Sequence, residues 1–188
     1  MRNLLLIISL GLFTLPLWAQ ETPTIPQDGS NLSATEMVDR IVEWEKGRVF
    51  RGISFNASYE SVFGKEEDQS LYEEEAPLYF TISVDLDYNL IEFADITYDF
   101  DEKGLFYITV EGYMGTVERT ESMVDIMSKE YTKRFGEPAL ADDGFLVWQG
   151  FDRSSGYNYE VAILDFSTPS DPGFILELYA LEERGADN

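Results

Sequence analysis

Residues 78–113 read LYFTISVDLDYNLIEFADITYDFDEKGLFYITVEGY, and this stretch decides the fold. Over 78–86 apolar residues alternate strictly with polar ones, which is the period of a strand with one buried face. The same period predicts strands over 90–100 and 105–113. Between those two strands, Asp101-Glu102-Lys103-Gly104 has the composition of a hairpin turn. We therefore expect an antiparallel meander of three strands.

Two details of this meander concern which residues face the core. Ile91 and Phe93 alternate in the opposite phase to Ile96 and the residues after it, which indicates a bulge near Ala94–Asp95. In the third strand, the residues expected to face the core are Phe106, Ile108 and Val110.

Helical spacing precedes and follows the meander. Ser33 and Glu36 form a capping box for a helix predicted over 34–46. A strand-like stretch at 48–55 and a short helix over 59–66 are expected next. After the meander, Thr120 is expected to cap a long helix that ends at Gly136. Three further strands are predicted over 145–150, 157–166 and 173–181.

This order predicts an α+β fold with a single antiparallel sheet of about six strands and helices packed on one face. A helix followed by a meander occurs twice, so we expect two helix-plus-meander units. Asp99-Phe100 and Asp165-Phe166 are each followed by a turn and a glycine. Either an internal duplication or the recurrence of ordinary hairpin chemistry explains the similarity between these two segments.

The N-terminal segment MRNLLLIISLGLFTLPLWA, residues 1–19, has the short apolar run of a secretory signal peptide, with an uncleaved anchor as the alternative. Residues 20–32 contain two prolines and no periodicity, which predicts a flexible leader, and 33–188 form the single α+β domain. An exported chain without cysteine is typical of the bacterial envelope. The expected location is therefore periplasmic or extracellular, without stable membrane insertion.

The composition excludes several functional classes. The chain has 36 acidic and 13 basic residues, a formal charge of -23, and neither histidine nor cysteine. Nucleic acid and anionic membrane surfaces would be repelled by this charge. Thiol chemistry and histidine acid–base chemistry are ruled out. No nucleophile elbow or phosphate-binding loop occurs, so no enzyme activity, catalytic residue or cofactor is assigned.

Two segments resemble the start of a calcium loop, Asp85-x-Asp87-x-Asn89 and Asp99-x-Asp101-x-Lys103-Gly104. Neither has the glutamate that completes such a loop, and both lie between strands, where these residues are ordinary turn formers. We therefore favour turn chemistry and assign no metal site. A calcium- or glycan-binding module and a small carboxylate-dependent hydrolase remain the alternatives.

The strongest functional signal is the second face of the sheet. When the apolar alternates pack beneath the helices, the residues between them point away, and these include several tyrosines and acids. Tyrosine is enriched in interface cores, although it also suits half-exposed strands that bind nothing. The candidate binding residues are Tyr79, Tyr107, Glu111, Tyr113, Glu177 and Tyr179.

Four stretches form a pattern: Arg51-Gly52-Ile53-Ser54-Phe55, Ser58-Tyr59-Glu60-Ser61-Val62, Tyr98-Asp99-Phe100, and Tyr131-Thr132-Lys133-Arg134-Phe135-Gly136-Glu137-Pro138 before Trp148. This pattern resembles that of many uncharacterised secreted bacterial proteins, and the expected architecture is similar to the β-lactamase-inhibitor-protein-like fold. The resemblance implies repeated helix-plus-meander units and an exposed sheet face that binds another protein. The chain lacks the cysteines of the secreted inhibitors, and no functional residue is carried over. We expect a non-catalytic binding module whose ligand is a protein.

Overall fold

The computed structural model describes residues 32–45, 48–66, 70–73, 79–87 and 91–181. The predicted signal peptide over 1–19 and the predicted leader up to residue 31 lie outside these ranges. Among the helices that are described, none has the length and apolar character needed to cross a membrane.

Over the residues that it describes, the structure is one antiparallel sheet with three helices, as the sequence predicts. The helices are α1 (Ala34–Val42), α2 (Tyr59–Lys65) and α3 (Val117–Phe135). The strands are β1 (Ser70–Glu73), β2 (Tyr79–Asp87), β3 (Glu92–Asp101), β4 (Gly104–Tyr113), β5 (Ala139–Leu140), β6 (Leu146–Phe151), β7 (Asn158–Asp165) and β8 (Gly173–Leu181). The expected count of about six strands is too low, because the short strands β1 and β5 extend the two edges.

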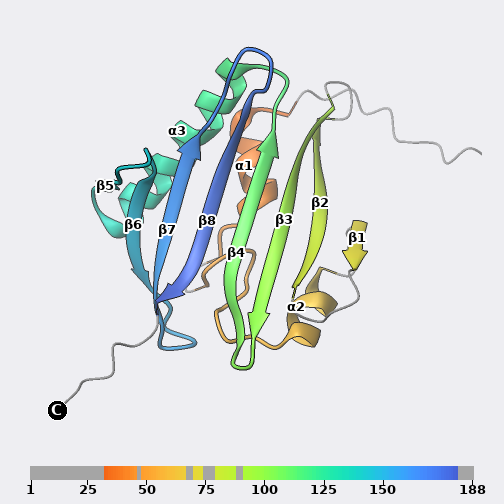
Figure 1. Cartoon of the computed structure of the whole chain (residues 1–188), viewed down its shortest axis with the longest axis vertical. Coiled ribbons are helices and arrows are strands. Elements are labelled where there is room, and N and C mark those ends of the chain that lie inside the picture. The colour runs from red at the N-terminus through yellow and green to blue at the C-terminus, as the bar shows by residue number, and fades with distance from the viewer. Residues whose placement is uncertain (1–31, 46–47, 67–69, 74–78, 88–90, 182–188) are drawn as a thin grey trace, which may run out of the picture.

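The helices lie on one face of the sheet. Helix α1 packs on α3 and β2, while α3 packs on β6, β7 and β8. Tyr59 of α2 makes edge contacts with the rings of Phe80 and Phe100 on the same face. Figure 1 shows α1 and α3 behind the strands. Among the described residues no helix lies against the other side of the sheet, which we call the open face.

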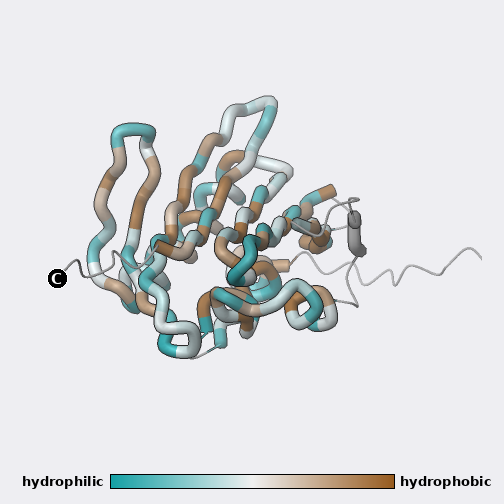
Figure 2. The backbone as a smooth tube through the Cα atoms, turned by 60° about the horizontal axis from the view of Figure 1, so that its bottom comes forward, coloured by the Kyte–Doolittle hydropathy of each residue, from teal (hydrophilic) through white to brown (hydrophobic). Residues whose placement is uncertain are grey.

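The core lies between the helices and the sheet. Its strand residues alternate with half-buried or exposed ones. In Figure 2, hydrophobic residues are interspersed with hydrophilic ones along the strands. The largest fully buried side chains include Trp148, Tyr98, Tyr131, Phe80 and Phe174. Burying apolar area on this scale is the main stabilising contribution in a chain without disulfides.

We call the segment from α1 to β4 the first unit and the segment from α3 to β8 the second unit. The sheet order β1-β2-β3-β4-β8-β7-β6-β5 places β4 and β8, the last strands of the two units, side by side. Strands β4 and β8 are antiparallel, and Gly112 lies directly opposite Phe174. A Cβ atom on Gly112 would lie 2.1 Å from Cε1 of Phe174, which is fully buried. The ring therefore occupies the space that any other residue at position 112 would fill.

The stretch over 48–55 is not a strand, which corrects the prediction from its apolar pattern. Phe50 and Ile53 form an isolated bridge around Arg51 and Gly52, both with positive φ. Arg51 is buried and binds both carboxylate oxygens of Glu66 at 2.8 and 3.0 Å. Its Nη1 also donates to the carbonyl of Arg40 in α1. This tight turn joins the ends of α1 and α2 through a buried ion pair.

The helix limits also differ from the prediction. Helix α1 ends at Val42 because Glu43 adopts a left-handed conformation, φ 45°. Helix α3 is capped by Thr116, whose hydroxyl accepts from the backbone N–H of Arg119. The predicted cap, Thr120, is instead fully buried in the first turn, where its hydroxyl donates to the carbonyl of Thr116.

The predicted bulge is in the wrong place. Strand β3 alternates without interruption past Ala94–Asp95. Its register with β2 shifts at Asp85/Asp87, where β2 has one extra residue opposite Phe93 and Glu92. Its register with β4 shifts at Asp99/Phe100, where β4 has one extra residue. That residue is Phe106, which is 40% exposed and does not face the core as expected. The core position before the bulge is occupied by Leu105. From Tyr107 onward the predicted phase is correct, with Ile108 and Val110 buried.

The contact between Gly112 and Phe174 predicts that Gly112→Ala lowers the free energy of unfolding by about 1–3 kcal/mol, the usual effect of overpacking a core. Gly64→Ala is the matched control. Gly64 is in α2 with no atom within 4 Å of an added Cβ, so the helical preference for alanine should stabilise by about 0.5–1 kcal/mol. Chemical denaturation measures both. Equal changes in the free energy of unfolding for the two variants would show that the packing of the Phe174 ring does not require a glycine at position 112.

Two buried tyrosines give a second test. The hydroxyl of Tyr98 donates to Glu66 at 2.7 Å, whereas that of Tyr131 has no hydrogen-bond partner in the described part of the chain. Tyr98→Phe should therefore cost about 1.5–3 kcal/mol, the range for a hydrogen bond to a charged group. Tyr131→Phe should leave stability unchanged or raise it. Thermal and chemical denaturation compare the two variants, and a reversed order would contradict the hydrogen-bond assignment.

Candidate functional site

The six candidate residues lie on the open face, in three strands. Tyr107, Glu111 and Tyr113 come from β4, and Glu177 and Tyr179 come from β8. The β4–β8 register places Tyr107 opposite Tyr179, with ring centroids 6.4 Å apart in an edge-to-face arrangement. Tyr107, Glu177 and Tyr179 are therefore brought together across the centre of the sheet, whereas Glu111 and Tyr113 lie farther along β4, opposite Ile175 and Gly173.

Tyr79 is farther away, on β2. It is opposite Asp99 of β3, which is in turn opposite Tyr107 of β4. The three residues form one row across the open face, and the row continues to Tyr179 on β8 and Glu160 on β7. The row shows that the candidate surface extends over both units of the sheet.

Each of three tyrosine hydroxyls on the open face donates a hydrogen bond to a carboxylate. Tyr107 donates to Glu177 at 2.6 Å, and Tyr113 donates to Glu111 at 2.8 Å. Tyr179 donates to Glu160 of β7. The bond from Tyr107 to Glu177 joins the two units, so these side chains hold each other in place.

These environments raise the pKa of all three hydroxyls to about 12. For Tyr107 and Tyr179 partial burial is the larger cause, followed by the hydrogen bonds to Glu177 and Glu160. For Tyr113 the hydrogen bond to Glu111 is the larger cause. The three hydroxyls therefore remain protonated donors at neutral pH.

Residues that the sequence analysis did not select also belong to the open face. Glu160 accepts from Gln149 at 3.0 Å as well as from Tyr179. The alternation along β7 identifies Glu160 as outward-facing, because Tyr159 and Val161 beside it are buried. On β3, the ring of Phe93 stacks on that of Tyr113, with ring centroids 4.8 Å apart. Phe93 was not selected because a bulge was predicted beside it, and a bulge changes the face on which a side chain lies.

The charge of the sheet is entirely of one sign. The eight strands that the structure describes contain no lysine or arginine. The described basic residues are in the helices and in the connections between elements. Acidic residues of the open face, in chain order, are Asp85, Asp95, Asp99, Glu111, Glu160 and Glu177. A surface of this kind attracts cations and repels anions.

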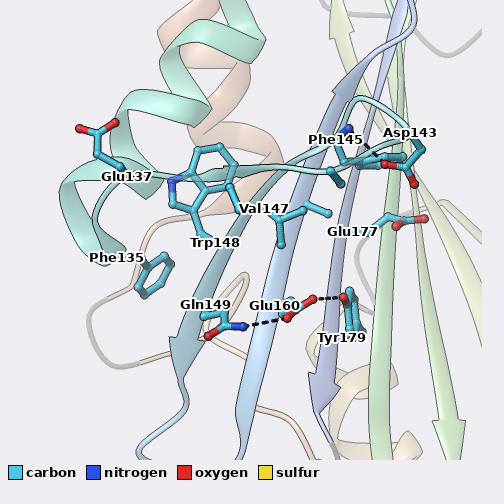
Figure 3. A pocket seen from close by; sticks show the side chains of 13 residues that line it. Phe135, Glu137, Asp143, Phe145, Val147, Trp148, Gln149, Glu160, Glu177 and Tyr179 are labelled. Carbon is cyan, nitrogen blue, oxygen red and sulfur yellow. Dashed lines mark hydrogen bonds between the residues drawn. The ribbon is translucent and has the colours of Figure 1, made fainter.

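A concave site of about 760 Å³ lies on the part of the open face formed by β6, β7 and β8. Figure 3 shows Tyr179, Glu160 and Gln149 connected by hydrogen bonds on one side, and Asp143 and Phe145 on another. Its acidic lining residues are Glu137, Asp143, Glu160 and Glu177, with apolar surface from Val147, Ala162, Phe145 and other residues. No lysine or arginine is among its described lining residues.

The aspartates of the calcium-like segments have other roles in the structure. Asp87 is buried 3.8 Å from Nη2 of Arg119, which also binds the buried Glu92 at 2.6 Å. Asp101 accepts from the backbone N–H of Lys103 and so shapes the β3–β4 turn. Asn89 lies outside the described residues. Within the described ranges, no group of three or more acidic residues is arranged to hold a metal ion.

The raised tyrosine pKa values predict how stability depends on pH. A hydroxyl whose pKa is about 10 in the unfolded chain and about 12 in the fold stabilises the protein fully below pH 10. That contribution is lost as pH rises from about 10 to 12. The double variant Tyr107→Phe/Tyr179→Phe should lose part of this dependence. Chemical denaturation of the wild-type protein and the variant at several pH values measures this dependence. The difference in phenolate absorbance between the two proteins follows the ionisation of Tyr107 and Tyr179, and ionisation of both hydroxyls near pH 10 would contradict the hydrogen-bonded arrangement.

Comparison with known proteins gives no relative from which to transfer a function. The chain matches no protein-family model, no curated protein and no solved structure.

Proposed function

We propose that this protein is a non-catalytic binding module whose open face recognises a basic surface of another protein. One observation carries the proposal: tyrosines and acids cover the face that the helices leave uncovered, while no strand in the described part of the chain supplies a lysine or arginine. The acids of that face therefore have no cation of the sheet to neutralise them. A basic partner would supply the missing charge.

The chemistry of the face suits lysine and arginine side chains. Carboxylates such as Glu177 accept charge-assisted hydrogen bonds, and the rings of Tyr107 and Tyr179 offer faces for cation–π contact. In the concave site, Val147 and Ala162 provide apolar surface for the methylene groups of a long basic side chain. An anchor residue of the partner would therefore place its stem on the sheet and its charge among the acids.

The architecture is consistent with this role. Two helix-plus-meander units forming one sheet are what the resemblance to the β-lactamase-inhibitor-protein-like fold implies. A protein partner that binds the open face is the matching functional expectation. Because residues 1–19 resemble a secretory signal peptide, we also propose that the chain is exported. The partner would then be found in the periplasm or outside the cell.

A peptide with the sequence Arg-Gly-Arg-Gly-Arg tests the proposal, with affinity measured by isothermal titration calorimetry. The double variant Glu160→Gln/Glu177→Gln removes two charges from the concave site but keeps acceptors for the tyrosine hydroxyls. We expect it to bind about tenfold more weakly, since hydrogen bonds between charged groups are the strong ones.

The control is Glu118→Gln/Glu121→Gln, which removes the same charge from an exposed part of α3. It should change the affinity by less than about twofold, because only the long-range attraction is reduced. Equal losses in the two double variants would show that the peptide responds to net charge alone, and the open face would not be a recognition site.

A further inference from the structure

A second concave site has the opposite charge to the open face. It lies where α3 and β6 end and has a volume of about 520 Å³. We call it the arginine groove. Its lining residues include Trp44, Arg48, Arg134, Phe151, Asp152 and Arg153. Three arginines in one groove are unexpected in a chain with a formal charge of -23 and 13 basic residues.

Among the described residues, two of these arginines have no carboxylate partner. Arg48 donates through Nη1 to the hydroxyls of Ser54 and Ser154, at 3.1 and 3.3 Å. In the part of the chain that the structure describes, neither Arg48 nor Arg153 lies within ion-pair distance of an acid. Because the chain has 36 acidic and 13 basic residues, a surface arginine is expected to form an ion pair with a carboxylate. Two guanidinium groups beside the same groove thus have unused capacity for an anion.

The acid in the groove does not fill that capacity. Asp152 is buried, and its Oδ2 accepts from the backbone N–H of Phe55 and from the hydroxyl of Ser155. Its Oδ1 accepts from the backbone N–H of Ser154. These bonds hold the β6–β7 turn against the 48–55 segment. The carboxylate of Asp152 is therefore a structural acceptor for the turn that carries Arg153.

The remaining lining is mostly aromatic. Phe151 is 56% exposed at the end of β6, although burying a phenylalanine ring is favourable. The third arginine, Arg134, has its Cζ 4.1 Å above the ring of Trp44 and donates through Nε to Glu130. The groove thus combines an apolar wall with guanidinium groups, and its volume is within the range of about 300–1,000 Å³ common for ligand sites.

We propose that the arginine groove binds a carboxylate attached to an apolar group, such as an aromatic ring. Arg48 and Arg153 contact the carboxylate, because a guanidinium group presents paired donors that match its two oxygens. Trp44 and Phe151 contact the apolar group. Two sources have this chemistry, a free aromatic acid and the C-terminal residue of a peptide. The site is separate from the open face, so it does not depend on the function proposed above.

Calorimetry with N-acetylphenylalanine and with its amide tests the proposal on the full chain. The acid should bind at least about tenfold more tightly than the amide, because only the acid pairs with the guanidinium groups. Arg48→Gln/Arg153→Gln should remove this preference. Lys129→Gln/Lys133→Gln, which changes the net charge equally on the exposed side of α3, should keep it. Equal binding of acid and amide, or binding of neither, would overturn the proposal.

Phe151→Ala provides a second test that does not alter charge. Because this ring is largely exposed, the variant should keep its denaturation midpoint and still bind the acid at least about threefold more weakly, since apolar contact is lost. Unchanged affinity for the acid would contradict the role of Phe151.

A hexapeptide ending in phenylalanine distinguishes the two sources. If it binds about tenfold more tightly than N-acetylphenylalanine, and amidation of its C-terminus abolishes this, the groove recognises a chain terminus. If the two bind equally, it takes the free acid. Either result supports a carboxylate site, whereas peptide binding that survives amidation would count against it.

Discussion

The packing where the two halves of the sheet join depends on one steric contact, in which the ring of Phe174 lies against Gly112. These residues are opposite each other on β8 and β4, the strands through which the two units meet. A glycine on one strand lets a buried aromatic ring from the other cover it. Because the units join here, Tyr107 of the first unit reaches Glu177 of the second. The candidate surface exists only while this strand pair is formed.

The distribution of charge follows from what the helices cover. Arg51 and Arg119 meet buried acids on the helical side, where an unpaired charge would be costly. Each also joins separate elements, since Arg51 binds Glu66 after α2 and Arg119 of α3 binds Glu92 of β3. Cations used in this way are not available to the open face. The buried ion pairs therefore lie on the helical side, and the open face keeps its acids without a basic residue from the described strands.

Local periodicity predicted the elements well, because alternation reports directly on which side of a strand is buried. It failed where a residue's role depends on distant partners. Phe106 resembles a core residue, but the bulge opposite Phe100 turns it outward. Arg51 interrupts an apolar stretch because Glu66, far along the chain, pairs with it. The adjacency of β4 and β8, and with it the composition of the open face, is likewise a long-range pairing that no local pattern contains.

The antiparallel pairing of β4 with β8 has a further consequence, because each is the last strand of its own unit. A local two-fold axis passes between Val110 and Leu176, the central pair of their register. Rotation about it carries the triplet Glu111-Gly112-Tyr113 onto Glu177-Leu178-Tyr179. The open face therefore displays one Glu-x-Tyr element twice, in opposite directions. For the binding role proposed above, a partner with its own two-fold symmetry would meet both copies at once, and its two contacts would reinforce each other as a bivalent attachment.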